Sequence, residues 1–124
     1  MRYWTLDLAE RVLRTYVAGL TAVELQRVRT RLEDGWKLVP GAYFSGEKGA
    51  CLLGIAIFDS DHRYMSASAN SAIFMAKELA NGTLCERAGE HHSAAEVFDS
   101  LIAWHPAVEG LLRRILGLPC APTS

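Results

Sequence analysis

One stretch of this chain has no side that can face water. Residues 49–58 read Gly-Ala-Cys-Leu-Leu-Gly-Ile-Ala-Ile-Phe, without a charge or a hydroxyl group. Drawn as a helix, residues 50–58 are apolar all round, and drawn as a strand they are apolar on both faces. The rest of the chain must therefore cover this segment. We expect it to be the buried centre of the fold, where each large apolar side chain stabilises by roughly 1.5–3 kcal/mol before entropy is subtracted.

Helical patterns flank this segment on both sides. Residues 6–18 place apolar side chains on one half of a helical wheel, and Gly19 predicts the end of that helix. Thr21-Ala22-Val23-Glu24 is a capping box that opens a second helix, which carries a narrow apolar stripe and ends at about Asp34. Three more helices are expected: from Ser66 or Ser68 to about Ala80, over 93–104, and from Pro106 to Gly117. We therefore predict a mainly α fold, a single compact bundle of five or six helices around the buried segment 50–58.

The alternative is an α+β fold with a short β-hairpin at about residues 38–57. Ser45-Gly46-Glu47-Lys48-Gly49 has the composition of a turn between two less polar arms. Pro40 cannot donate to a strand ladder and would demote the first arm to a sheet edge. We favour a helix for residues 50–58 because the surrounding segments have helical patterns, and the hairpin stays open.

The length and composition are those of one ordinary globular domain. The chain has 124 residues, of which 50% are hydrophobic and 22% charged. We expect one domain over residues 1–118 and a loose tail over residues 119–124. The formal net charge of −1 argues against nucleic-acid binding through a general positive field.

The sequence favours a cytoplasmic protein that does not enter a membrane. Its longest apolar run is about half the length needed to cross a bilayer. Asp7 and Glu10 interrupt the apolar pattern of the N-terminal region, which is therefore not a signal peptide. The three cysteines (Cys51, Cys85 and Cys120) are widely spaced, which predicts reduced thiols. Because Cys51 lies in the apolar run, we expect an inert thiol with a raised pKa.

We find no motif for a phosphate loop or a hydrolase nucleophile, and this favours a non-catalytic function. The chain also holds many aromatic residues for one small core, and exposed aromatic rings often anchor interfaces. We therefore predict a small intracellular regulatory or interaction module that binds another protein or a second copy of itself, without a cofactor. The interface candidates are Tyr3, Trp4, Trp36, Tyr43, Phe44 and Phe74.

A second hypothesis is a small enzyme that depends on a metal ion or on acid–base catalysis. Carboxylates and imidazoles are ligands of divalent metal ions. The candidate residues are Asp59, Asp61, His62, His91, His92 and Glu96. Their spacing matches no recognised metal signature, and we expect no bound metal.

The third hypothesis is DNA binding through the helical hairpin 6–34. Its candidate residues are Arg11, Arg14, Arg27 and Arg31, and a helix-turn-helix would place the second helix in the major groove. Glu24, Glu33 and Asp34 offset the positive charge of that second helix. A helix with mixed charges is usually a solvated face, which argues against this hypothesis.

Overall fold

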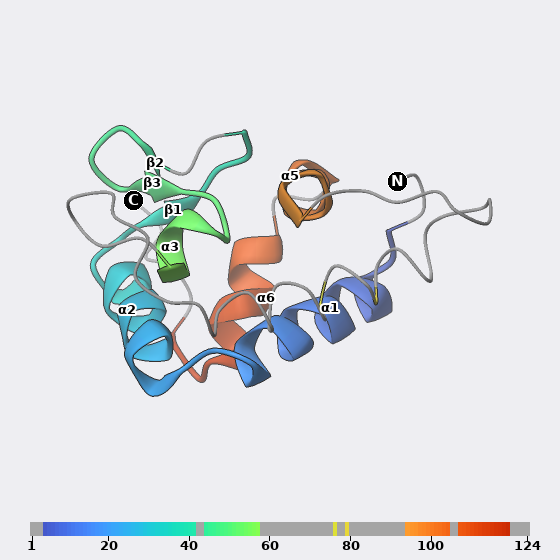
Figure 1. Cartoon of the computed structure of the whole chain (residues 1–124), viewed down its shortest axis with the longest axis horizontal. Helices are drawn as coiled ribbons and strands as arrows, with labels where there is room; N and C mark the ends of the chain where they lie inside the picture. The colour runs from blue at the N-terminus through green and yellow to red at the C-terminus, as the bar shows by residue number, and fades with distance from the viewer. Residues whose placement is uncertain are drawn as a thin grey trace.

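A computed structural model describes residues 4–41, 44–57, 76, 79, 94–104 and 107–119 (Figure 1). These residues are mostly helical and include a small three-stranded sheet, so the prediction of a mainly α chain is confirmed. The helices in this part of the chain are α1 (Leu6–Ala18), α2 (Ala22–Glu33), α3 (Gly54–Ile57), α5 (Ala94–Trp104) and α6 (Val108–Ile115). The strands are β1 (Lys37–Leu38), β2 (Phe44–Ser45) and β3 (Gly49–Ala50).

Threonine caps open the first two helices where the sequence predicts them. The Thr5 hydroxyl accepts from the amide of Leu8 at the start of α1 (3.1 Å). At the start of α2 the Thr21 hydroxyl accepts from the amide of Glu24 (3.2 Å), and the Glu24 carboxylate accepts from the amide of Thr21 (2.7 Å). The predicted capping box is thus complete, and it satisfies two amides that have no partner inside the helix.

Glycines in the left-handed conformation end α2 and α6. Gly35 follows α2 with φ 90°, and Gly117 follows α6 with φ 73°. In both places the next residue donates its amide to the carbonyl five residues earlier (3.0 Å and 2.8 Å), which is the Schellman arrangement. Gly19 differs: it ends α1 with φ −92°, so the predicted stop is confirmed although it does not use a positive φ.

The sheet has β3 in the middle, with β1 parallel on one side and β2 antiparallel on the other. Ala50 is opposite Leu38 in β1 and opposite Phe44 in β2. A Cβ atom at Gly49 would lie 2.4 Å from the carbonyl oxygen of Ser45, so only glycine fits there. The turn of the alternative hairpin prediction is confirmed, because β2 and β3 pair antiparallel on either side of it. The paired arms are only two residues long, and Leu38 lies in β1, which pairs parallel with β3.

The central apolar segment is buried over residues 50–56, as predicted. It does not form one helix, and that part of the prediction is wrong. Ala50 pairs in β3, and α3 begins four residues later, where the Cys51 sulfur accepts from the amide of Gly54 (3.3 Å). Phe58 lies outside the described residues. Gly49 and Ala50 form a strand because both flanking strands pair with their backbone.

Tyr16 joins the helices to this central segment. Its hydroxyl donates to the carbonyl of Leu52, and its ring meets the ring of Phe98 edge to face, with centroids 5.6 Å apart. Burial raises the pKa of Tyr16 well above its ordinary value of 10.0, and the nearby Cys51 and Glu24 add to this. The core therefore continues from α1 across the central segment to α5.

Figure 1 shows α2 beside α3 and the sheet, whereas α1 crosses α6 and extends away from them. α5 also contacts α6. Of the helix expected up to Ala80, the structure describes only Ala76, which is buried, and Leu79, which is half-buried. The single compact bundle and the domain limits at 118 and 119 stay predictions. No helix within the described ranges is long and apolar enough to cross a membrane.

Candidate functional site

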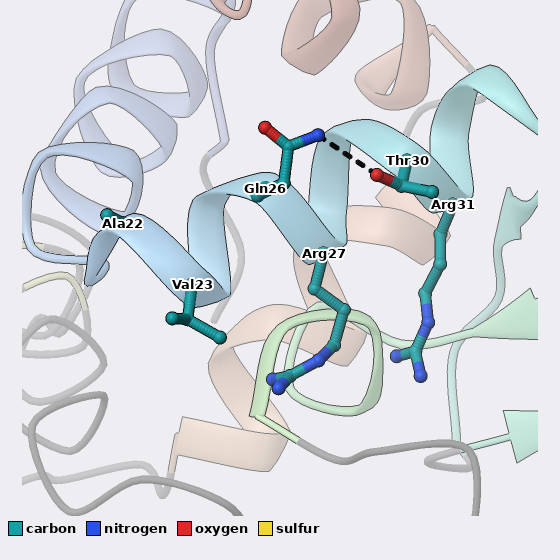
Figure 2. A pocket seen from close by; sticks show the side chains of 6 residues that line it. All are labelled: Ala22, Val23, Gln26, Arg27, Thr30 and Arg31. Carbon is teal, nitrogen blue, oxygen red and sulfur yellow. Dashed lines mark hydrogen bonds between the residues drawn. The ribbon is translucent and has the colours of Figure 1, made fainter.

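Arginines of α2 hold α3 in place. Arg31 donates to the carbonyls of Gly54 (3.0 Å) and Ile55 (3.2 Å), and Arg27 donates to the carbonyl of Ala56. The two guanidinium groups thus supply donors to the carbonyls of three successive residues of α3. Figure 2 shows both side chains extending from α2 toward α3. These two arginines therefore bind α3, Arg31 as a buried residue and Arg27 as a half-buried one.

An arginine of α2 binds the end of α6, and an arginine of α6 binds near the end of α2. Arg29 of α2 donates to the carbonyl of Leu116 at the end of α6. Arg113 of α6, which is only 4% exposed, donates to the carbonyl of Leu32 near the end of α2 (2.8 Å). The C-terminal carbonyls of a helix carry partial negative charge, so each helix end receives a cation from the other helix.

Arg31 is also enclosed by aromatic rings. Its guanidinium carbon lies 4.8 Å from the ring centroid of Trp36 and 5.5 Å from that of Phe44. The two rings meet edge to face at 6.1 Å. These distances are those of cation–π contacts, so Trp36 and Phe44, two predicted interface residues, help to bury the arginine. Both rings are half-buried.

The outer side of α2 carries an open groove of about 520 Å³ between two ridges of side chains (Figure 2). One ridge has the residues Ala22, Gln26 and Thr30, and the other has Val23, Arg27 and Arg31. We call this the α2 groove. Gln26 donates to Thr30 along the first ridge (3.1 Å). At the head of the second ridge Val23 is 67% exposed, and the groove is mostly apolar.

A second groove of about 680 Å³ lies between the start of α1 and one side of α6. It includes Leu6, Gly110, Leu111, Arg114 and Leu118. Leu6 is 63% exposed. Leu6 and Val23 are the exposed large hydrophobic residues of the described part of the chain, and each borders one of the two grooves. These two positions are therefore a matched pair for experiments.

The structure separates the four DNA-binding candidates into two groups. Arg11 and Arg14 of α1 are exposed, and Arg14 pairs with Glu10 (2.9 Å). Arg27 and Arg31 bind carbonyls of α3, as described above. The hairpin therefore does not present the four guanidinium groups together on one exposed face, which argues against a duplex-binding surface.

The structure describes three of the six aromatic interface candidates. Trp4 is only 7% exposed, donates from its indole nitrogen to the Ser100 hydroxyl (2.9 Å) and packs near Trp104. It is a core residue, because it closes the space between the start of α1 and α5, and its ring is buried there. Trp36 and Phe44 are half-buried. Tyr3, Tyr43 and Phe74 lie outside the described residues.

The metal and acid–base candidates are mostly outside the structure's described ranges. Asp59, Asp61, His62, His91 and His92 belong to this group. Glu96 is described and is exposed near the start of α5. Within the described residues, no three His, Cys, Asp or Glu side chains lie together as a metal site would require. The enzyme hypothesis stays a prediction.

Cys51 has the environment that the sequence predicts. It is 4% exposed, and burial raises its pKa, although the amide of Gly54 partly opposes this by donating to the sulfur. A raised pKa keeps the thiol protonated at neutral pH, and the protonated form is a poor nucleophile. Cys51 therefore fits a structural role.

Val23 lines the α2 groove but is not among the interface residues predicted from the sequence. The apolar stripe of its helix consists of Leu25, Val28 and Leu32, and Val23 lies on the opposite side. The sequence therefore did contain a signal for this residue, because an apolar side chain opposite the stripe is expected to be exposed.

Comparison of the chain with protein-family models, curated proteins and solved structures finds no match.

Proposed function

We propose that this chain is a non-catalytic interaction module that binds another protein, or a second copy of itself, through the α2 groove. The observation that carries the proposal is the 67% exposure of Val23 at the head of a mostly apolar groove. Exposed apolar side chains that border a concave surface are typical of protein-binding sites. The two arginines that line the groove, Arg27 and Arg31, bind backbone carbonyls of α3.

The arrangement of α2 also supports a stable docking surface. Its inner side is tied to α3 and α6 through Arg27, Arg29 and Arg31. A helix that is held on its inner side can present its outer side without large reorganisation, and this lowers the entropic cost of binding. Arg27 and Arg31 also line the α2 groove, so the contacts that hold α2 adjoin the proposed binding surface.

Photo-crosslinking tests the proposal. A benzophenone amino acid replaces Ala22, which is exposed in the groove, or Ala18, which is exposed on α1 and serves as the matched control. In extracts of the source cells we expect adducts from position 22 that are absent from position 18. Excess unlabelled wild-type chain should suppress these adducts, and the Val23→Glu variant should not.

Two results would overturn the proposal. The first is that position 22 yields no adduct that the wild-type chain suppresses. The second is that Val23→Glu competes as well as the wild type. If Leu6→Glu fails to compete while Val23→Glu still competes, the binding surface is the groove between α1 and α6, and the α2 groove has no such role.

A further inference from the structure

Building on that proposed function, we infer that the partner is an amphipathic helix whose apolar ridge lies in the α2 groove and whose flank carries a carboxylate opposite Arg27. The shape of the groove and the charge at its edge point to this kind of partner.

The shape of the groove is that of a helix-packing surface. Its two sides are the rows 22/26/30 and 23/27/31, in which successive residues are four apart. Rows of this kind form the ridges of a helix, and the groove between two rows accepts the matching ridge of another helix at about 50°. A peptide added as a β-strand would need an unpaired strand edge, and a polyproline II peptide would need an aromatic-lined groove; the described lining of the α2 groove has neither.

The head of the groove selects for apolar side chains. Ala22 and Val23 both belong to its first turn, and Val23 is 67% exposed. Leucine or valine residues spaced by four on an incoming helix would cover this turn. Gln26 donates to Thr30 on the opposite ridge, which uses one hydrogen-bonding group of each side chain.

Arg27 sets the charge preference. Its guanidinium binds the carbonyl of Ala56, which is neutral, and no carboxylate of the described residues pairs with it. The positive charge at the edge of the groove is therefore not neutralised by the described part of the chain. A carboxylate there would gain a charge-assisted contact, and an ammonium group would be repelled.

The experiment uses displayed helical peptides. A library of 18-residue helices varies Leu, Val and Ala along one i, i+4 row and Glu, Gln and Lys at the two flanking rows, and the full-length chain is the bait. We expect enrichment of apolar ridges with Glu on one flank. Val23→Glu should weaken the selected peptide by tenfold or more, because its apolar contact is lost. The Leu6→Glu control should stay within twofold.

A double-mutant cycle tests the contact with Arg27. Arg27→Gln removes the charge and keeps a donor for the Ala56 carbonyl. Changing the selected glutamate to glutamine should weaken binding to the wild type by about fivefold and leave binding to Arg27→Gln unchanged. Circular dichroism and thermal unfolding of each variant check that the fold is retained. If the glutamate-to-glutamine change in the peptide lowers the affinity equally for the wild type and for Arg27→Gln, the charge preference is overturned.

The remaining outcomes separate this inference from the proposed function. Enrichment of lysine, or of peptides that bind Val23→Glu equally well, would overturn the inference and leave the crosslinking result standing. Failure to enrich any peptide would also overturn it. A wild-type dimer in light scattering that Val23→Glu dissociates would assign the groove to a second copy. Duplex DNA that competes with the selected peptide at low salt and loses affinity on Arg27→Gln would replace the helix with a nucleic acid.

Discussion

α1 and α2 are neighbouring helices that both carry arginines, and they use them in opposite ways. α1 buries a broad apolar stripe, which includes Val12, Leu13 and Tyr16, and its arginines face solvent. α2 buries only Val28 and Leu32 as apolar residues. Its arginines instead reach carbonyls of α3 and α6.

The difference shows how a helix with a narrow stripe can still be held in a fold. The arginine stem is apolar and can be buried along a neighbouring surface, while the guanidinium supplies several donors to carbonyls that need them. Removing one of these α2 side chains would leave a carbonyl of α3 or α6 without that donor, so each should be sensitive to substitution. The exposed arginines of α1 should not be sensitive to substitution.

The largest effect is expected from Arg31→Ala. This change removes two hydrogen bonds to α3 and the contacts with Trp36 and Phe44. We expect the free energy of unfolding to fall by about 3 kcal/mol or more, measured by urea denaturation with circular dichroism. The free energy of unfolding of Arg31→Lys should lie between those of the wild type and Arg31→Ala, because an ammonium group lacks the planar guanidinium fork. A loss below about 1 kcal/mol for Arg31→Ala would show that α2 does not depend on its arginines.

Tyr16→Phe should have the next largest effect, on the α1 side of the comparison. It leaves the Leu52 carbonyl without its donor in the core, and we expect a loss of about 1–3 kcal/mol at pH 7. Urea denaturation measures it directly. An unchanged stability would mean that the apolar stripe of α1 acts without this bond.

The same variant has a pH signature. Because the folded-state pKa of Tyr16 is raised, the unfolded chain loses this proton first as the pH increases. The stabilisation from Tyr16 is complete below about pH 10 and is lost as the pH rises through the folded-state pKa. The difference in unfolding free energy between the wild type and Tyr16→Phe should therefore shrink above about pH 10. A difference that stays constant would contradict the burial of this hydroxyl.

The two threonine caps should have smaller effects. Thr5→Ala and Thr21→Ala each remove a side-chain acceptor at a helix start, and we expect each to lose about 1 kcal/mol in thermal or urea unfolding. Thr→Ser at the same positions keeps the hydroxyl and is the matched control. If Thr5→Ala lowers stability and Thr21→Ala does not, the arginines and the narrow apolar stripe hold α2 in place without its cap.

The smallest effect is expected from Arg14→Ala. Its side chain is 61% exposed and pairs with Glu10 in an i, i+4 contact on α1. Exposed pairs of this kind contribute little, so the unfolding free energy should change by no more than about 0.5 kcal/mol. A loss close to that of Arg31→Ala would remove the contrast between the two helices.

The local signals of the sequence were sufficient for the helix ends. The Thr21 capping box, the periodicity of residues 6–18 and the glycines at 35 and 117 act over a few residues, and each marks the end that the structure has. The burial of residues 50–56 was predictable for a similar reason, because an apolar segment has to be covered whatever its conformation.

The conformation of that segment and the roles of the arginines were not predictable in this way. A strand and a helix bury the same apolar side chains at residues 50–58, and the choice depends on backbone pairing with residues 37–38 and 44–45. Arg27 and Arg31 have the same local pattern as solvated arginines, and their acceptors lie more than 20 residues away. The groove was partly predictable, since Val23 opposes the apolar stripe.

The contacts between α3 and α2 have a consequence for the order of folding. Helices in proteins owe most of their stability to tertiary packing rather than to their own propensity. The guanidinium groups that bind the carbonyls of α3 come from a helix more than 20 residues earlier in the chain. We therefore expect α3 to form late, after α2 has docked, with low φ-values for substitutions in α3 and higher ones in α2.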